Sequence, residues 1–127
     1  MAEVVLDASA LLALLNAEPG AEIVAEAIPG AAISAINLSE VVSKLSEAGM
    51  PESAIRHSLQ PLGLEVIPFD EDQAYQTGLL RAPTKGMGLS LGDRGCLGLA
   101  QKLGLLVLTA DRTWLELSMG VTVKIIR

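Results

Sequence analysis

Short, continuously apolar segments that alternate with helical segments are the feature that most constrains this fold. Residues 4–6 (Val-Val-Leu) are typical of a strand buried on both faces of a parallel sheet. Similar patterns predict strands at 31–34, 64–68, 105–108 and 121–125. Helices are predicted from the first strand to residue 15 and at 21–28, 38–47, 52–59, 70–80 and 90–103, with a loop at 82–88. This alternation predicts an α/β sandwich of three layers, with helices on both faces of a central, mainly parallel five-stranded sheet.

The composition fits a single domain spanning residues 1–127. Half of the residues are hydrophobic and only three are aromatic, so we expect a core of aliphatic side chains. Cys96 is the only cysteine, which excludes an internal disulfide and favours a reducing compartment. We see no basic leader followed by an apolar stretch, and every apolar stretch is too short to span a bilayer. We therefore expect a cytoplasmic protein without a membrane partner.

Four acidic residues lie where predicted strands end or predicted helices begin: Asp7, Glu40, Asp93 and Asp111. Asp7 and Asp111 lie just past the first and fourth strands, where open α/β sheets bind ligands. Carboxylates brought close together repel one another and favour divalent cations between them. A site of this kind is a common means of hydrolysing phosphodiesters with Mg²⁺ or Mn²⁺.

Each acid also has a purely structural interpretation. Asp7 and Asp111 have the positions of helix N-caps. Asp93 follows Ser90, and Glu40 follows Asn37, with the three-residue spacing of a capping box. Glu40 is also placed to pair with Lys44 one helical turn later. Asp93 fits the structural interpretation least well, because it begins the apolar stripe of its predicted helix, and a carboxylate facing a core is costly unless it is paired or binds metal.

The cations suggest where phosphates would bind. The net charge is −6, but residues 81–112 carry five basic side chains against two acidic ones. Arg94 and Arg112 each follow a candidate acid, and Lys85 lies in the glycine-containing loop, so all three are candidates for RNA phosphate contacts. A salt bridge within the site is the alternative for either arginine, and a solvated surface position is the alternative for the lysine.

Two hydroxyls stand two residues from candidate acids. Ser9 follows Asp7 and Thr109 precedes Asp111, so either hydroxyl is placed to bond a carboxylate or a metal-bound water. A local turn or cap hydrogen bond is an equal alternative. We interpret Cys96 as a small core residue.

The chain resembles a PIN domain, and within that group the toxin nuclease of the VapC type. Four segments carry the resemblance, which covers essentially the whole chain: residues 4–9 (VVLDAS), 37–41 (NLSEV), 90–100 (SLGDRGCLGLA) and 108–114 (LTADRTW). The resemblance implies a PIN-like fold, a Mg²⁺- or Mn²⁺-dependent endoribonuclease, and the four acids as metal ligands and catalytic residues. It also implies a homodimer, a cognate antitoxin that blocks the site, and structured RNA such as transfer or ribosomal RNA as the substrate. Gly95 and Gly98 depart from the family's pattern, in which alanine is expected, and should loosen their helix by ~1 kcal/mol each.

Other enzyme classes fit the motifs less well. A haloacid-dehalogenase-like phosphatase needs a second aspartate where Ser9 stands, and a receiver domain needs a lysine after the fifth strand, whereas Lys124 lies inside it. His57 is the only histidine and lies in a helix remote from the motifs, which disfavours a histidine-pair ribonuclease. Metal-assisted hydrolysis predicts a 5′-phosphate and a 3′-hydroxyl. The remaining alternative is a catalytically weak PIN-like module that binds RNA or a protein.

Overall fold

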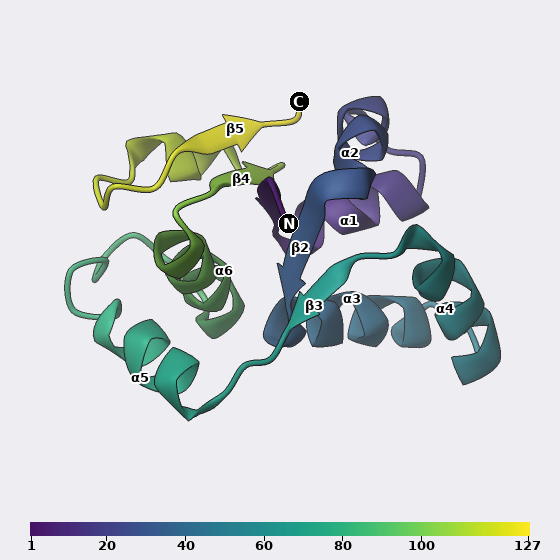
Figure 1. The fold of residues 1–127 in the computed structure, drawn as a ribbon, viewed down its shortest axis with the longest axis horizontal. Coiled ribbons are helices and arrows are strands. Elements are labelled where there is room, and N and C mark those ends of the chain that lie inside the picture. The colour runs from purple at the N-terminus through teal and green to yellow at the C-terminus, as the bar shows by residue number, and fades with distance from the viewer.

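The computed structural model describes all residues, 1–127, and contains one sheet of five strands in the order β3-β2-β1-β4-β5 (Figure 1). Every neighbouring pair is parallel, so the α/β prediction is confirmed and the sheet is parallel throughout. The strands are β1 (Val4–Leu6), β2 (Ala31–Ser34), β3 (Glu65–Ile67), β4 (Leu106–Thr109) and β5 (Val123–Ile125). All carboxyl ends therefore lie along one edge of the sheet.

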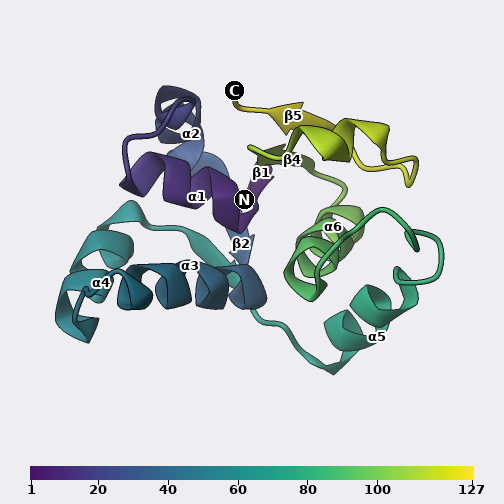
Figure 2. The ribbon, with the colours of Figure 1, turned by 180° about the vertical axis from the view of Figure 1, so that it is seen from behind.

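Helices cover both faces of the sheet. Figures 1 and 2 show α5 and α6 on one side of the strands and α1 to α4 on the other, which is the predicted three-layer arrangement. The helices are α1 (Ala8–Leu15), α2 (Ala21–Ala27), α3 (Ala35–Glu47), α4 (Glu52–Leu59), α5 (Glu71–Leu79) and α6 (Leu91–Leu103). Three short 3₁₀ helices complete the fold: η1 (Ile28–Gly30), η2 (Gln60–Leu62) and η3 (Arg112–Glu116). None of the helices is long and apolar enough to cross a membrane.

The core alternates along the central strands as a pleated sheet requires. Val5 pairs in register with Val107, and both pack in the cluster that contains α6. Leu6 pairs with Leu108, and both pack on the opposite face with residues of α1 and α2. Trp114 is the only aromatic side chain in these core clusters, so the prediction of an aliphatic core is confirmed.

Helix α3 begins three residues earlier than predicted. The cap is Ser34, whose hydroxyl accepts a hydrogen bond from the Ile36 amide, so Asn37 lies inside the first turn. The capping-box interpretation of Asn37 and Glu40 is therefore wrong. At α6 the same interpretation is correct, because Ser90 and Asp93 exchange both hydrogen bonds of a capping box.

The two unexpected glycines of α6 allow close helix packing. A Cβ on Gly95 would lie 2.7 Å from the Ile36 Cγ2 methyl of α3. A Cβ on Gly98 would lie 3.3 Å from the Thr77 hydroxyl of α5. Glycine lowers the helical propensity of α6, but at Gly95 it leaves room that alanine would fill.

Candidate active site

Asp7 stands at the centre of the carboxyl edge, directly after β1. It is the N-cap of α1, where Oδ1 accepts a hydrogen bond of 2.8 Å from the Ala10 amide. The side chain is 5% exposed, so the strand's end and the first turn of α1 enclose it almost completely. The predicted cap is present, but the carboxylate makes more hydrogen bonds than a cap requires.

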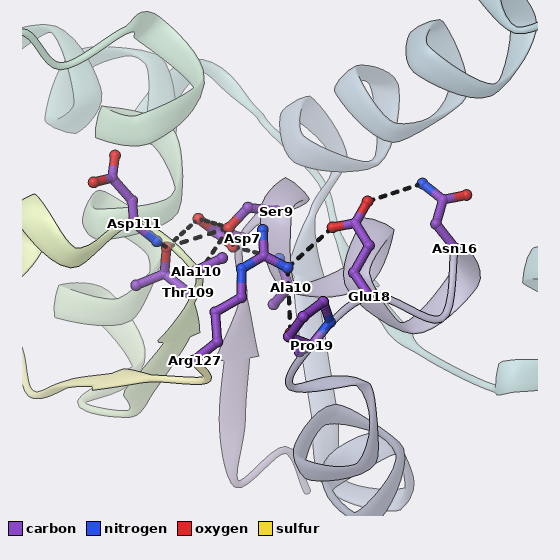
Figure 3. Close-up of polar contacts among 10 residues, drawn as sticks. All are labelled: Asp7, Ser9, Ala10, Asn16, Glu18, Pro19, Thr109, Ala110, Asp111 and Arg127. Atoms are coloured by element: carbon purple, nitrogen blue, oxygen red, sulfur yellow. Dashed lines mark hydrogen bonds and ion pairs between the residues drawn. The ribbon is translucent and has the colours of Figure 1, made fainter.

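Two hydroxyls, one from the first turn of α1 and one from the end of β4, hold the Asp7 carboxylate (Figure 3). The Ser9 hydroxyl lies 2.7 Å from Oδ1 and 2.9 Å from Oδ2, and accepts in turn from the Ala110 amide at 2.9 Å. The Thr109 hydroxyl donates to Oδ2 at 2.6 Å and accepts from the Asp111 amide at 3.0 Å. The carboxylate is therefore fixed by donors from two separate chain segments.

Burial governs the protonation of Asp7. Removal from water raises its pKa from the ordinary value of 3.8, and the negative charge of Asp93 raises it further. The hydrogen bonds from Thr109, Ala10 and Ser9 lower the pKa and offset part of this effect. The ionised form is thus held at a cost in folding free energy, a pattern that is common at functional sites.

Glu40 reaches the site from the second turn of α3. Its Oε1 accepts a hydrogen bond of 2.9 Å from Asn37 Nδ2, and the same nitrogen donates to the Gly92 carbonyl of α6 at 2.9 Å. No ion pair forms with Lys44; the chain's two ion pairs are Arg56–Glu52 and Arg127–Glu18. Glu40 is consequently directed toward the start of α6 rather than along its own helix.

Asp93 lies in the first turn of α6, next to Gly92. Its Oδ2 accepts a hydrogen bond of 3.0 Å from the Ser90 amide, and the carboxylate is half-buried. Its charge acts on Asp7, which places the two carboxylates in one electrostatic neighbourhood.

Cys96 follows Asp93 by three residues in α6 and is fully buried. Burial is the largest cause that raises the pKa of its thiol, followed by the charges of Asp7, Asp93 and Glu40. Charges from three separate elements therefore act on one core residue. The thiol is a small buried residue of the core, as predicted.

Asp111 is adjacent but differently oriented. It is the N-cap of η3, and its Oδ1 accepts from the Thr113 amide at 3.0 Å and the Thr113 hydroxyl at 2.6 Å. Figure 3 shows its carboxylate pointing away from that of Asp7, while its backbone amide joins the Thr109 hydroxyl. The structure thus brings the fourth acid to the same edge with its side chain turned into its own loop.

As the side chains stand, no three acidic, histidine or cysteine side chains are close enough to ligate one metal ion together. The donor set nevertheless suits a hard divalent cation, because it consists of carboxylate oxygens. Mg²⁺ typically binds one or two carboxylates directly and retains several waters. The four acids therefore fit a hydrated ion better than a closed cage of direct ligands.

Comparison with known proteins decides the family. A family model described as the PIN domain matches residues 4–118. The chain belongs to the PIN domain family. No curated protein sequence matches it.

Solved structures show the same fold. A DNA-bound VapBC complex from Salmonella typhimurium contains a chain that is 25% identical, with a TM-score of 0.78 and full coverage of both chains. A toxin–antitoxin complex from Klebsiella pneumoniae matches at 24% identity and a TM-score of 0.74, covering 94% of this chain and 96% of that one. VapBC-1 from Haemophilus influenzae matches at 18% identity and a TM-score of 0.73, covering 97% of each. The predicted resemblance to PIN domains of the VapC type is confirmed.

The candidate phosphate-binding cations of this PIN domain form no ion pairs. Arg94 is half-buried and its Nε has no hydrogen-bond partner. Arg112 is exposed and donates to the Arg127 carbonyl at 2.7 Å. Lys85 is exposed in the loop after α5. The salt-bridge alternative for the two arginines is therefore wrong.

Sequence reasoning missed two residues at this PIN-domain site. Asn37 was interpreted as a possible helix cap, and Gly92 was not singled out. The three-residue spacing of Asn37 and Glu40 within one helix was an available signal, since side chains so placed share a face. No sequence signal relates Gly92 to Glu40, because their contact joins two helices far apart in the chain.

Proposed function

We propose that this PIN domain is the toxin of a toxin–antitoxin pair and acts as a divalent-metal-dependent endoribonuclease. The observation that carries the proposal is the contact of Glu40 with Gly92, next to Asp93, together with the Thr109 hydroxyl that joins Asp7 to the Asp111 amide. The charge of Asp93 in turn acts on Asp7. The toxin–antitoxin complexes among the similar structures support the biological role. The partner would be a cognate antitoxin that covers the site, and the active form a homodimer in the cytoplasm.

The four acids would hold Mg²⁺ or Mn²⁺, with some of them acting through water. When bound, the ion supplies positive charge against the phosphate oxygens and makes a coordinated water more acidic. Ser9 and Thr109 would keep the Asp7 carboxylate in one orientation and ionised, because hydrogen bonds to a carboxylate favour its charged form. These hydrogen bonds offset part of the effect of burial on the pKa of Asp7.

The cations beside the acids would bind the RNA backbone. Arg94, Arg112 and Lys85 carry charges that no carboxylate of this chain neutralises at ion-pair distance. Hydrolysis adds water across the phosphodiester, so that the phosphorus–O3′ bond breaks and the products are a 5′-phosphate and a 3′-hydroxyl. Structured RNA, such as transfer or ribosomal RNA, is the proposed substrate class.

The test is cleavage of transfer and ribosomal RNA by purified protein, with the 5′ ends mapped. We expect cleavage in Mn²⁺ or Mg²⁺ that a chelator abolishes and that Asp93→Asn removes. Asp72→Asn, the same change at an exposed position of α5, is the matched control and should cleave like the wild type. Equal cleavage by Asp93→Asn would contradict the proposal, and RNA binding without cleavage by the wild type would favour a binding module.

A further inference from the structure

The Glu40 carboxylate is held by two groups to which neither the family resemblance nor the metal chemistry assigns a role. Asn37 is 1% exposed, and its Nδ2 lies 2.9 Å from both Glu40 Oε1 and the Gly92 carbonyl. Both partners are pure acceptors, so the orientation of the amide is fixed by chemistry. One amide group therefore ties the acid of α3 to the first turn of α6.

Gly92 supplies the second restraint. A Cβ built on Gly92 would overlap both carboxylate oxygens of Glu40, so the carboxylate packs directly on the bare backbone of α6. Gly92 lies inside a regular helix and is not among the glycines with positive φ. The backbone conformation does not demand glycine here; the approach of the carboxylate does.

Asn37 carries a cost that a purely structural residue would avoid. Its Oδ1 is buried without a hydrogen-bond partner, and such unsatisfied groups are uncommon in folded proteins and concentrate where function requires them. Glu40 also makes no ion pair with Lys44, one turn away on the same helix. A neutral amide of its own helix thus holds Glu40 against the first turn of α6.

We propose that Asn37 and Gly92 are positioning residues that hold the Glu40 carboxylate next to the first turn of α6, where it can bind the metal ion. This inference rests on the proposed function. The two residues act through Glu40: Asn37 by donating to Oε1, and Gly92 by leaving the space that the carboxylate fills. Removing either restraint allows Glu40 to turn away from Asp93, which weakens the affinity of the site for a divalent ion.

The test measures Mn²⁺ binding to metal-free protein by isothermal titration calorimetry, with RNA cleavage and urea unfolding as parallel readouts. Gly92→Ala and Asn37→Leu should each weaken Mn²⁺ binding by about 10- to 100-fold, the range typical when residues that orient ligands are lost. Asn37→Leu keeps the branching and the number of heavy atoms of the side chain and removes both hydrogen bonds. The matched controls are Gly78→Ala, at a helical glycine with nothing within 4 Å of a built Cβ, and Asn16→Leu, at an exposed position. Both controls should bind Mn²⁺ like the wild type.

A double-mutant cycle separates positioning from general damage to the fold. In a Glu40→Gln background, neither Gly92→Ala nor Asn37→Leu should weaken Mn²⁺ binding further, because the group they position is already lost. The inference would be overturned if both single variants bound Mn²⁺ with wild-type affinity. It would also be overturned if the two substitutions weakened Mn²⁺ binding as much in the Glu40→Gln background as in the wild type. In either case, metal-dependent cleavage by the wild type would still uphold the proposed function. A wild type that neither binds Mn²⁺ nor cleaves RNA would overturn both.

Discussion

Two buried threonines allow a sharp test of how the site is held. Thr109 and Thr77 are both fully buried. The Thr109 hydroxyl donates to Asp7 and accepts from the Asp111 amide, whereas the Thr77 hydroxyl has no hydrogen-bond partner. Replacement of either threonine by valine is nearly isosteric, so the two substitutions should change the free energy of unfolding in opposite directions.

The magnitudes follow from the contacts. A hydrogen bond to a charged group contributes about 1.5–3 kcal/mol, and the added methyl group recovers up to ~0.8 kcal/mol. Thr109→Val should therefore lower the free energy of unfolding by about 2 kcal/mol. The preference of valine for strands does not cancel this loss. Thr77→Val removes an unsatisfied hydroxyl and should raise the free energy of unfolding by about 1 kcal/mol.

The effect of Thr109→Val should depend on pH. The pKa of Asp7 is raised in the folded protein, so its ionisation makes stability fall as pH rises from 3.8 through the folded pKa. Loss of the Thr109 hydrogen bond raises that pKa further, so the fall in stability extends to higher pH and becomes larger in total. The difference from the wild type should thus be largest above the folded pKa of Asp7 and smallest below pH 3.8, where the carboxyl is protonated in both states.

The assay is urea unfolding of the wild type and both variants across this pH range. Thr77→Val serves as the control, since its difference from the wild type should not vary with pH. A Thr109→Val variant as stable as the wild type at neutral pH, or a penalty that does not shrink on acidification, would refute the assignment of Thr109 as a donor to ionised Asp7.

Two further predictions concern helix packing and the cost of the site. Gly95→Ala should lower the free energy of unfolding by about 1–2 kcal/mol, because the overlap with Ile36 outweighs the gain in helix propensity. Gly78→Ala, where a Cβ meets nothing, should raise the free energy of unfolding by up to ~1 kcal/mol. Urea unfolding compares the two variants, and a stabilised Gly95→Ala protein would contradict the packing account. Asp7→Asn should raise the urea midpoint of unfolding at pH 7, because asparagine can still cap α1 without a buried charge. The same variant should weaken Mn²⁺ binding in calorimetry. A lower urea midpoint would show that the charge of Asp7 does not destabilise the fold.

Local patterns predicted much of the fold. The strands beginning at residues 4 and 31 are short and mostly apolar, and the parallel pairing follows from the helices placed between successive strands. Asp7 and Asp111 were located because a residue just past a parallel strand must lie at the carboxyl edge. The start of α3 was placed too late because Ser34, the last residue of a strand, is also the cap of the helix.

The finer geometry depends on contacts between distant segments. Thr109 reaches Asp7 across more than one hundred residues, and only the pairing of β1 with β4 brings them together. The orientation of Asp111 follows from its hydrogen bonds to Thr113, which compete with any orientation toward Asp7. The contact of Glu40 with Gly92 requires the close packing of α3 and α6, which no periodicity in either helix encodes.

The most direct measurement of the central claim is the anomalous scattering of manganese in crystals grown with Mn²⁺. Our account predicts a peak at the carboxyl edge of the sheet, within direct or water-mediated reach of Asp7, Glu40 and Asp93, that is lost in the Asp93→Asn protein. A well-ordered site without a peak, or a peak that persists unchanged in Asp93→Asn, would contradict the claim that these carboxylates together bind a divalent ion.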